Sequence, residues 1–345
     1  MTDSAPPKIL IRTPNWLGDL VMATGFFRAV LEIYPESQVD LIVKSGFENL
    51  PLPHRGKVII FDSKHNSAGT FGKTLRFENY ANFYILPPSF SSAWMAFQSR
   101  IPQRIGYAGE YRSLLLTVAK KHEETPRSQH LLKEYLNLLA PDLSVAKYPP
   151  SLETTEEWIE TQINSFQKSL PDSFIVFTPG AIYGPAKQWP LEHFRALASL
   201  LHNVFGDPIV ILGTEADEGF GAEISQGLDW VQNYCGQTSL PELLAILAKA
   251  KLLIGNDSGS MHLMGALQRP QVAIFGSTSP AWTAPINPRS SVQYRNLFCS
   301  PCFSKTCRYG HYDCLTQIQP KMILDESQKL LTPGNWTEVK NVVPE

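Results

Sequence analysis

The sequence lacks a long apolar run, a charge excess of either sign and the common glycine-rich nucleotide motifs. No segment approaches the roughly 20 apolar residues that cross a bilayer. A formal net charge of −2 gives no global signal for a polyanionic partner, so nucleic acid is not expected. No P-loop is present, and no GxGxxG follows the first expected strand, which argues against a nicotinamide oxidoreductase.

Cysteine is scarce, and four of the five cysteines are crowded into one segment. The opening residues Met1–Pro7 show no signal peptide, so we expect a cytoplasmic protein whose thiols stay reduced. With His311 among them, the crowded cysteines permit a zinc site, but their spacing is not that of a standard zinc ribbon. We therefore favour free thiols and predict no protein-bound metal. The four are Cys299, Cys302, Cys307 and Cys314.

A chain of 345 residues exceeds what one hydrophobic core usually serves, which predicts two domains. Two prolines in the segment Tyr148–Ser151 precede a helical pattern at Thr154–Lys168, so we place the boundary there. The expected parts are residues 1–150, residues 151–320 and a helical tail, 321–345, that could pack back on the first domain.

Short β-rich runs alternate with helical patterns, which predicts an α/β fold of two doubly wound, Rossmann-like domains with parallel sheets. The pattern loosens between Asp62 and Arg127. Expected strands are Lys8–Arg12, Val39–Val43, Val58–Phe61, Phe83–Leu86, Phe174–Thr178, Pro208–Leu212, Lys251–Ile254 and Val272–Phe275. Expected helices are Leu20–Ile33, Ser91–Gln98, Leu191–His202, Leu240–Ala250 and Met261–Leu267.

Ligands of such sheets bind beyond the carboxyl ends of the strands, so the loops after the strands are the candidate sites. The first loop places Asp19 at the start of a helix. An aspartate there can be an N-cap, or it can be a carboxylate base that takes a proton from an attacking hydroxyl. Both roles are compatible.

The loop after Phe174–Thr178 carries Lys187, which can offer a compact positive charge to a diphosphate. A solvated surface lysine is the alternative. Thr178 and Trp189 are further possible ligand contacts, although a tryptophan more often anchors the core than stacks on a base. After the next strand, Glu215 can accept hydrogen bonds from ribose hydroxyls or simply be an acid in a first helical turn.

The segment from Gly255 to His262 joins an apolar strand to a helix and is rich in small and hydroxyl residues. The unpaired N–H groups of a helix start favour an anion such as phosphate. Asp257 would repel that anion, so a functional Asp257 should face the neutral hydroxyls of a sugar. Capping by Asp257 or Ser258 is the alternative, and His262 is either a phosphate donor or a structural histidine. Together these loops predict a nucleotide-diphosphate site, with Asp19 contributed by the other domain.

Four segments in this order resemble glycosyltransferase family 9, the heptosyltransferases: KILIRTPNWLGDLVMATG, TPGAIYGPAKQWPLEHF, IGNDSGSMHLMGAL and AIFGSTSP. The match spans both halves and is least characteristic over Gly46–Lys147. It implies a GT-B fold that binds the lipopolysaccharide core acceptor in the first domain and the donor ADP-L-glycero-β-D-manno-heptose in the second. Such enzymes invert the anomeric centre and need no resident cofactor.

The resemblance also implies roles for single residues. Asp19 matches the family's proposed base, Lys187 a diphosphate contact, Glu215 a ribose contact and Asp257 a contact to the donor sugar. Five further residues match the family's stretch around the donor diphosphate: Ser258, Gly259, Ser260, Met261 and His262.

Basic residues outnumber acidic ones between Lys44 and Lys121. They are Lys44, Arg55, Lys57, Lys64, Lys73, Arg76, Arg100, Arg104, Arg112, Lys120 and Lys121, against Glu48, Asp62, Glu78 and Glu110. This surplus suits an anionic Kdo- and heptose-bearing lipid A acceptor and peripheral contact with the cytoplasmic face of the inner membrane. A solvated face with scattered charges is the alternative. Four apolar residues of this region could contact lipid or pack in the core, and core packing is the commoner outcome. They are Phe90, Trp94, Met95 and Phe97.

Three other interpretations remain open from the sequence: a GT-B transferase for another nucleotide sugar, a non-enzymatic protein that binds a nucleotide sugar, and a zinc-dependent scaffold.

Overall fold

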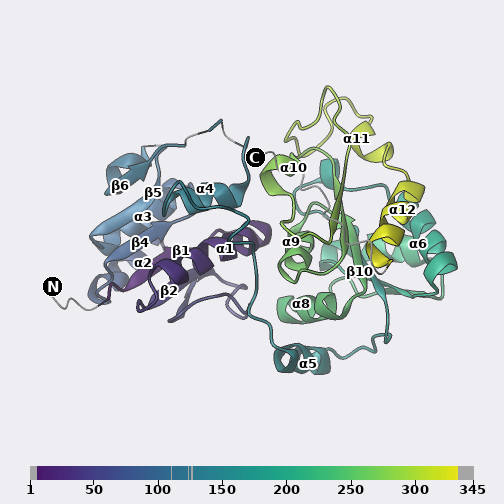
Figure 1. The fold of residues 1–345 in the computed structure, drawn as a ribbon, viewed down its shortest axis with the longest axis horizontal. Helices are drawn as coiled ribbons and strands as arrows, with labels where there is room; N and C mark the ends of the chain where they lie inside the picture. The colour runs from purple at the N-terminus through teal and green to yellow at the C-terminus, as the bar shows by residue number, and fades with distance from the viewer. Residues whose placement is uncertain (1–5, 110, 123, 126, 333–345) are drawn as a thin grey trace. The chain divides into compact units, whose positions relative to one another are not determined.

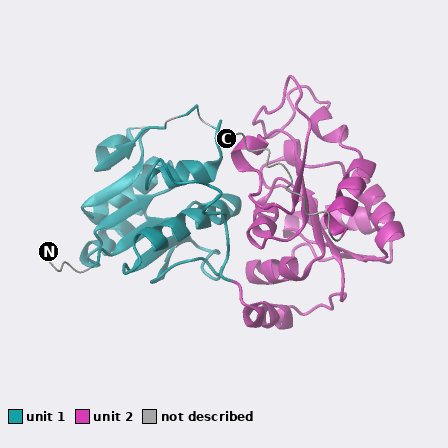
Figure 2. Cartoon of the chain, viewed as in Figure 1, with its two compact units in different colours: residues 1–153 teal, residues 154–345 magenta. Residues whose placement is uncertain are grey.

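The computed structural model describes residues 6–109, 111–122, 124–125 and 127–332, and the chain forms two compact units (Figure 1). The first unit is residues 1–153 and the second is residues 154–345 (Figure 2). In the described part of the chain, no helix is both long enough and apolar enough to cross a membrane.

The first unit is built on a six-stranded sheet of order β3-β2-β1-β4-β5-β6 in which every neighbouring pair is parallel. Its strands are β1 (Ile9–Arg12), β2 (Val39–Lys44), β3 (Val58–Phe61), β4 (Asn82–Ile85), β5 (Gln103–Tyr107) and β6 (Val118–Lys120). Its helices are α1 (Leu17–Ile33), α2 (Ala68–Thr74), α3 (Phe90–Ser99) and α4 (Leu131–Asn137), with short 3-10 helices η1 (Leu75–Phe77) and η2 (Arg112–Leu115).

Helices cover both faces of this sheet. Phe26 of α1 packs edge-on against Tyr84 of β4, with ring centroids 5.4 Å apart. The next residue of β4, Ile85, and the preceding one, Phe83, belong to the hydrophobic cluster that contains α3 residues such as Met95. Since successive side chains of a strand point to opposite faces, α1 and α3 lie on opposite sides of the sheet.

The second unit repeats this plan with a parallel sheet of order β12-β11-β10-β7-β8-β9. Its strands are β7 (Ile175–Thr178), β8 (Ile209–Ile211), β9 (Val231–Asn233), β10 (Leu252–Asn256), β11 (Gln271–Phe275) and β12 (Ser290–Tyr294). Its helices are α5 (Glu156–Ser165), α6 (Leu191–Phe205), α7 (Glu218–Ser225), α8 (Leu240–Lys249), α9 (Gly259–Ala266), α10 (Pro280–Thr283), α11 (Asp313–Thr316) and α12 (Pro320–Leu331), with 3-10 helices η3 (Pro185–Lys187) and η4 (Glu215–Asp217).

Helix α12 belongs to the second unit, where it packs against α6. Its apolar face, with Ile323, Leu324 and Leu330, is part of the core that also holds Trp189. The remainder of the predicted tail, residues 333–345, lies outside the described residues, so its predicted return to the first domain stays a prediction.

The predicted α/β fold with two parallel doubly wound sheets is confirmed. Both strand orders reverse direction once, between β1 and β4 in the first unit and between β7 and β10 in the second. Ligands of doubly wound sheets bind at this reversal, beyond the carboxyl ends of the strands. The loops after β1, β7 and β10 therefore hold the candidate functional side chains.

Candidate functional site

At the reversal in the second sheet, two polar side chains donate to one carboxylate oxygen of a third. Lys187 Nζ, from η3 after β7, lies 2.5 Å from Asp257 Oδ2, directly after β10. The hydroxyl of Thr278, which follows β11, donates to the same oxygen at 2.5 Å. Asp257 and Thr278 are each 4% exposed, so this carboxylate is held almost out of solvent between a cation and a hydroxyl. Charge-assisted bonds of this kind are stronger than neutral ones.

Asn256, the last residue of β10, joins the loops on either side of the reversal. Its Oδ1 accepts from the backbone N–H of Trp189 at 3.0 Å, and its Nδ2 donates to the carbonyl of Pro179 at 2.6 Å. The side chain is completely buried. Asn256 therefore fixes both ends of the loop that carries Lys187, a role that the sequence analysis missed.

Helix α9 begins beside this network. Ser258 is its N-cap residue but makes no side-chain capping bond, and Asp257 bonds to Lys187 and Thr278 instead, so the capping alternative is not observed for either. The hydroxyls of Ser258 and Thr178 are enclosed and have no hydrogen-bond partner within the described residues. Such hydroxyls, together with the free N–H groups of the first helical turn, suit an anionic or polar ligand.

Two residues predicted in this stretch have buried side chains. Met261 packs with Ala273 and Phe275, so only its backbone N–H faces the helix start. His262 is 6% exposed and lies one residue further into the helix. Residue 255 must be a glycine because its backbone lies directly against the side chain of Thr178. A Cβ at this position would lie 2.0 Å from the Thr178 hydroxyl oxygen.

Glu215 begins η4, after β8, with its side chain exposed. The turn is capped by two other residues, since the Asp217 carboxylate accepts from the backbone N–H and the hydroxyl of Thr214, both at 2.8 Å. Asp217 also lies against Gly180 of the Lys187 loop, where a Cβ would come within 2.3 Å of its Oδ1. Capping by Asp217 leaves Glu215 available for a ligand at this edge.

Trp189 requires a correction. Its ring is completely buried, packs edge-on against Phe194 and donates from Nε1 to the carbonyl of Ile318 at 2.8 Å. A ring enclosed in this way cannot stack on a base, so the core interpretation holds. Its contribution to the site is its backbone N–H, which is bonded to Asn256.

In the first unit, Asp19 is the third residue of α1, whose N-cap is Trp16. Asp19 is therefore not the N-cap, although a carboxylate in the first turn is favoured by the helix dipole. The loop before it is shaped by Arg12, which is 3% exposed and donates to the side-chain oxygen of Asn15 at 2.5 Å and to the carbonyl of Thr13 at 2.8 Å. Burial lowers the pKa of Arg12 to about 10.

A second carboxylate of the first unit, Glu134 of α4, was not predicted. Burial raises its pKa to about 7. His122 Nδ1 lies 3.8 Å from its Oε2, and the His122 ring stacks on Tyr107 at 4.0 Å between centroids. Burial, and then the charge of Arg112, lower the pKa of His122. His122 comes from the stretch with the least regular sequence pattern, Asp62–Arg127, and Glu134 follows that stretch.

The basic surplus of the first unit divides into two groups. Arg112 is buried, and Arg76, Arg104 and Lys120 donate to backbone carbonyls. Exposed positions are occupied by Lys44, Arg55, Lys57, Lys64, Lys73, Arg100 and Lys121. Of the apolar candidates in this region, Met95 is core whereas Phe90 and Phe97 are 47% and 42% exposed. Four of the eleven basic residues therefore have structural roles, whereas the other seven are exposed.

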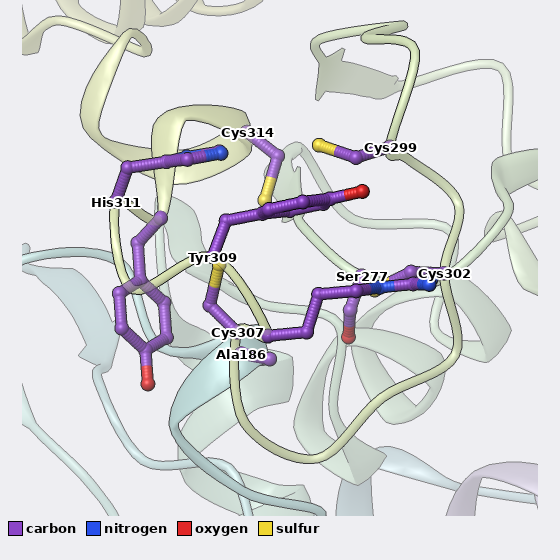
Figure 3. Close-up of a pocket in the computed structure, with 10 residues that line it drawn as sticks. Ala186, Ser277, Cys299, Cys302, Cys307, Tyr309, His311 and Cys314 are labelled. Carbon is purple, nitrogen blue, oxygen red and sulfur yellow. The ribbon is translucent and has the colours of Figure 1, made fainter.

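The crowded cysteines line a small cavity of about 20 Å³ together with His311, Ala186 and Ser277 (Figure 3). All five cysteines are unpaired thiols. Burial and the neighbouring thiols raise the pKa of Cys314 to about 11. Within the described residues, no three His, Cys, Asp or Glu side chains are arranged to hold a metal ion. The cavity adjoins the Lys187 and Thr278 loops through Ala186 and Ser277.

The sequence and the fold are similar to those of known proteins. Residues 68–313 match the model of glycosyltransferase family 9 (heptosyltransferase). Lipopolysaccharide heptosyltransferase 2 of Salmonella typhimurium is 31% identical over 94% of this chain and 99% of its own length. The solved E. coli ADP-heptose lps heptosyltransferase II is 30% identical, with a TM-score of 0.82 over 94% of this chain and 98% of that one. E. coli heptosyltransferase WaaC with ADP, 20% identical, shares the fold with a TM-score of 0.68 over 93% of this chain and 99% of that one.

Proposed function

The chain belongs to glycosyltransferase family 9, the heptosyltransferases, and we propose that it transfers heptose from ADP-heptose to a hydroxyl of the lipopolysaccharide inner core, with inversion at the anomeric carbon. The observation that carries the proposal is the network of Lys187, Asp257 and Thr278 beside the start of α9. It combines a cation and free N–H groups for a diphosphate with a carboxylate for sugar hydroxyls.

In this proposal the second unit binds the donor. Lys187 and the N–H groups of the first turn of α9, from Gly259 to Met261, bind the diphosphate, and Ser258 and His262 add hydrogen bonds. Glu215 accepts from the ribose of ADP, and Asp257 accepts from hydroxyls of the heptose. Enclosed hydroxyls and a shielded carboxylate at one sheet edge support this assignment.

Asp19 is proposed as the base. It takes the proton from the acceptor hydroxyl as the oxygen attacks the anomeric carbon, and the bond from that carbon to the diphosphate oxygen breaks on the opposite side. The electron pair leaves with ADP, whose added negative charge is stabilised by Lys187 and the α9 dipole. Since these groups supply the positive charge, we propose that no resident metal or other cofactor takes part. A covalent carboxylate intermediate is not needed for inversion.

The acceptor is assigned to the first unit. An anionic Kdo- and heptose-bearing lipid A core suits its exposed lysines and arginines. The layer of η1, α3 and η2 also exposes Phe77, Phe97 and Leu114, of which Phe77 and Leu114 are each 86% exposed. Apolar and basic side chains together support peripheral contact with the cytoplasmic face of the inner membrane.

The test is a panel of nucleotide sugars followed by a transfer assay. A ligand that binds the native state raises its melting temperature by mass action, so ADP-heptose should stabilise the chain and a UDP-sugar should not. Lys187→Met should remove most of that stabilisation. The assay then supplies core acceptors with and without the first heptose.

Stabilisation by a UDP-sugar alone would overturn the donor assignment and favour another GT-B transferase. Binding of ADP-heptose without transfer to any core acceptor would favour a non-enzymatic nucleotide-sugar-binding protein instead.

A further inference from the structure

We infer that Thr278 is a positioning residue that holds Asp257 in place for the donor sugar when Lys187 turns toward the diphosphate. The inference rests on the proposed function. It starts from one feature of the geometry: Lys187 and Thr278 both donate to Oδ2 of Asp257, each at 2.5 Å.

These two donors differ in what can draw them away. The ammonium of Lys187 is flexible and charged, and the negative charge of a diphosphate would attract it away from the carboxylate. The hydroxyl of Thr278 is neutral and enclosed, at 4% exposure, so it keeps its bond when the cation moves. Thr278 thus preserves the orientation of Asp257, with Oδ1 left to accept from sugar hydroxyls.

The backbone around Thr278 is braced from two sides. The N–H of Ser277 donates to the carbonyl of Ala186 at 3.1 Å, which ties it to the residue before Lys187. The carbonyl of Ser277 accepts from the N–H groups of Cys302 at 3.0 Å and Phe303 at 2.7 Å. A serine hydroxyl, that of Ser300, also donates to the carbonyl of Gly276 at 2.7 Å.

The same cysteine-bearing loop supports the lysine. The hydroxyl of Tyr183 donates to the carbonyl of Phe303, and the Lys187 ammonium lies 5.0 Å from the centre of the Tyr183 ring. The N–H of Ala186 donates to the carbonyl of Lys305 at 3.0 Å. The loop from Cys299 to Cys307 therefore places both groups that hold Asp257, which gives this segment a role that requires no metal.

If Thr278 positions Asp257, its loss should weaken binding of the donor sugar and leave binding of the nucleotide unchanged. ADP carries the diphosphate and the ribose but no heptose, so its binding does not require Asp257 to face a sugar, and its affinity should not depend on the Thr278 hydroxyl. Any preference of the protein for ADP-heptose over ADP should depend on Thr278. This difference separates a positioning role from a general structural one.

The experiment measures the affinities of ADP and ADP-heptose for the full chain by calorimetry. Thr278→Val keeps the side-chain shape and removes the hydroxyl, and it should weaken ADP-heptose binding about ten- to a hundredfold, the usual effect of one hydrogen bond to a charged group. ADP binding should stay within about twofold. Thr278→Ser restores the hydroxyl and should restore the preference. Thr283→Val, which changes another buried threonine of the same unit, should alter neither affinity.

Unchanged ADP-heptose binding in Thr278→Val, or an equal loss for both ligands, would overturn the inference. If the valine variant does not fold, Thr278→Ala, which also removes the hydroxyl, must show the same selective loss of ADP-heptose affinity. A wild type with equal affinity for ADP and ADP-heptose would instead refute the donor sugar of the proposed function.

Discussion

The two sheets share one strand order, yet the charged side chains at their carboxyl edges are used differently. In the second unit, Lys187 is bonded to the carboxylate of Asp257, and both follow strands at the reversal of the sheet. In the first unit, the cation at the same place is Arg12, and it is bonded to Asn15 and to backbone carbonyls.

The two cations therefore have different roles: Arg12 shapes a loop, whereas Lys187 is placed to bind a ligand. Buried Arg12 satisfies backbone oxygens and fixes the path of the chain into α1, where Asp19 stands in the first turn. Lys187 has a side-chain partner that a charged ligand can replace. In the proposed function, the first unit supplies the base, Asp19, from a helix whose preceding loop is held by Arg12. The second unit supplies the donor site, where a diphosphate can replace Asp257 as the partner of Lys187.

The largest effect should come from Asp19→Asn, which tests this division directly. Without the base, we expect the turnover number for transfer to fall about 10²–10⁴-fold. Donor affinity should stay within about twofold, because the proposed donor contacts all belong to the second unit. Steady-state kinetics and calorimetry with ADP-heptose provide the two measurements.

Asp142→Asn removes an exposed acid of the first unit and should leave both quantities unchanged. Full transfer activity in Asp19→Asn would place the base elsewhere.

A smaller effect is expected from Asn256→Ala. The change leaves the N–H of Trp189 and the carbonyl of Pro179 without partners, which should cost about 2–4 kcal/mol of unfolding free energy. It should also weaken ADP binding, since the Lys187 loop loses its anchor. Urea unfolding and calorimetry measure the two consequences.

Asn287→Ala is a matched control. Asn287 is 2% exposed, donates to the carbonyl of Arg269 at 2.7 Å and accepts from the N–H of Arg289 at 2.8 Å, where β11 and β12 begin. Its loss should lower stability similarly and leave ADP affinity alone. If the two variants change ADP affinity equally, Asn256 has no specific role in anchoring the Lys187 loop.

The smallest effect concerns Glu134 in the first unit. Because burial raises its pKa to about 7, the native state holds this proton more tightly than the unfolded state, and stability falls as the pH rises from about 4.5 to above 7. Glu134→Gln should therefore gain about 1–2 kcal/mol at pH 8, an amount reduced by partial exposure, and nothing at pH 4.5.

Urea unfolding at the two pH values measures the gain. Glu32→Gln should show no such gain at pH 8, because the bond from Lys147 lowers the pKa of the Glu32 carboxyl. A glutamine variant of Glu134 with the same stability difference at both pH values would contradict the buried-acid account.

The parallel fold and the loops after its strands could be predicted, because central strands such as β7 and β10 are continuous apolar runs. The strands β6 and β9 have three residues each, are mostly not buried and lie at sheet edges, so no apolar run marks them. Asp257 and Lys187 could be identified from the sequence as candidate ligand contacts. The bond between them and the contribution of Thr278 depend on the register of three strands, which brings their loops together. The sequence carries no local signal for that register.

The brace formed by the Cys299–Cys307 loop has a consequence for how the protein is made. Every proposed contact to the donor, from Lys187 to His262, leaves the ribosome before this loop does. The nascent chain can therefore form its first unit and most of the second sheet while Ser277 and Ala186 still lack the partners that fix them. Competence to bind the donor should arise late in synthesis, and a chain that ends before Cys299 would carry all the proposed ligand contacts without the support that arranges them.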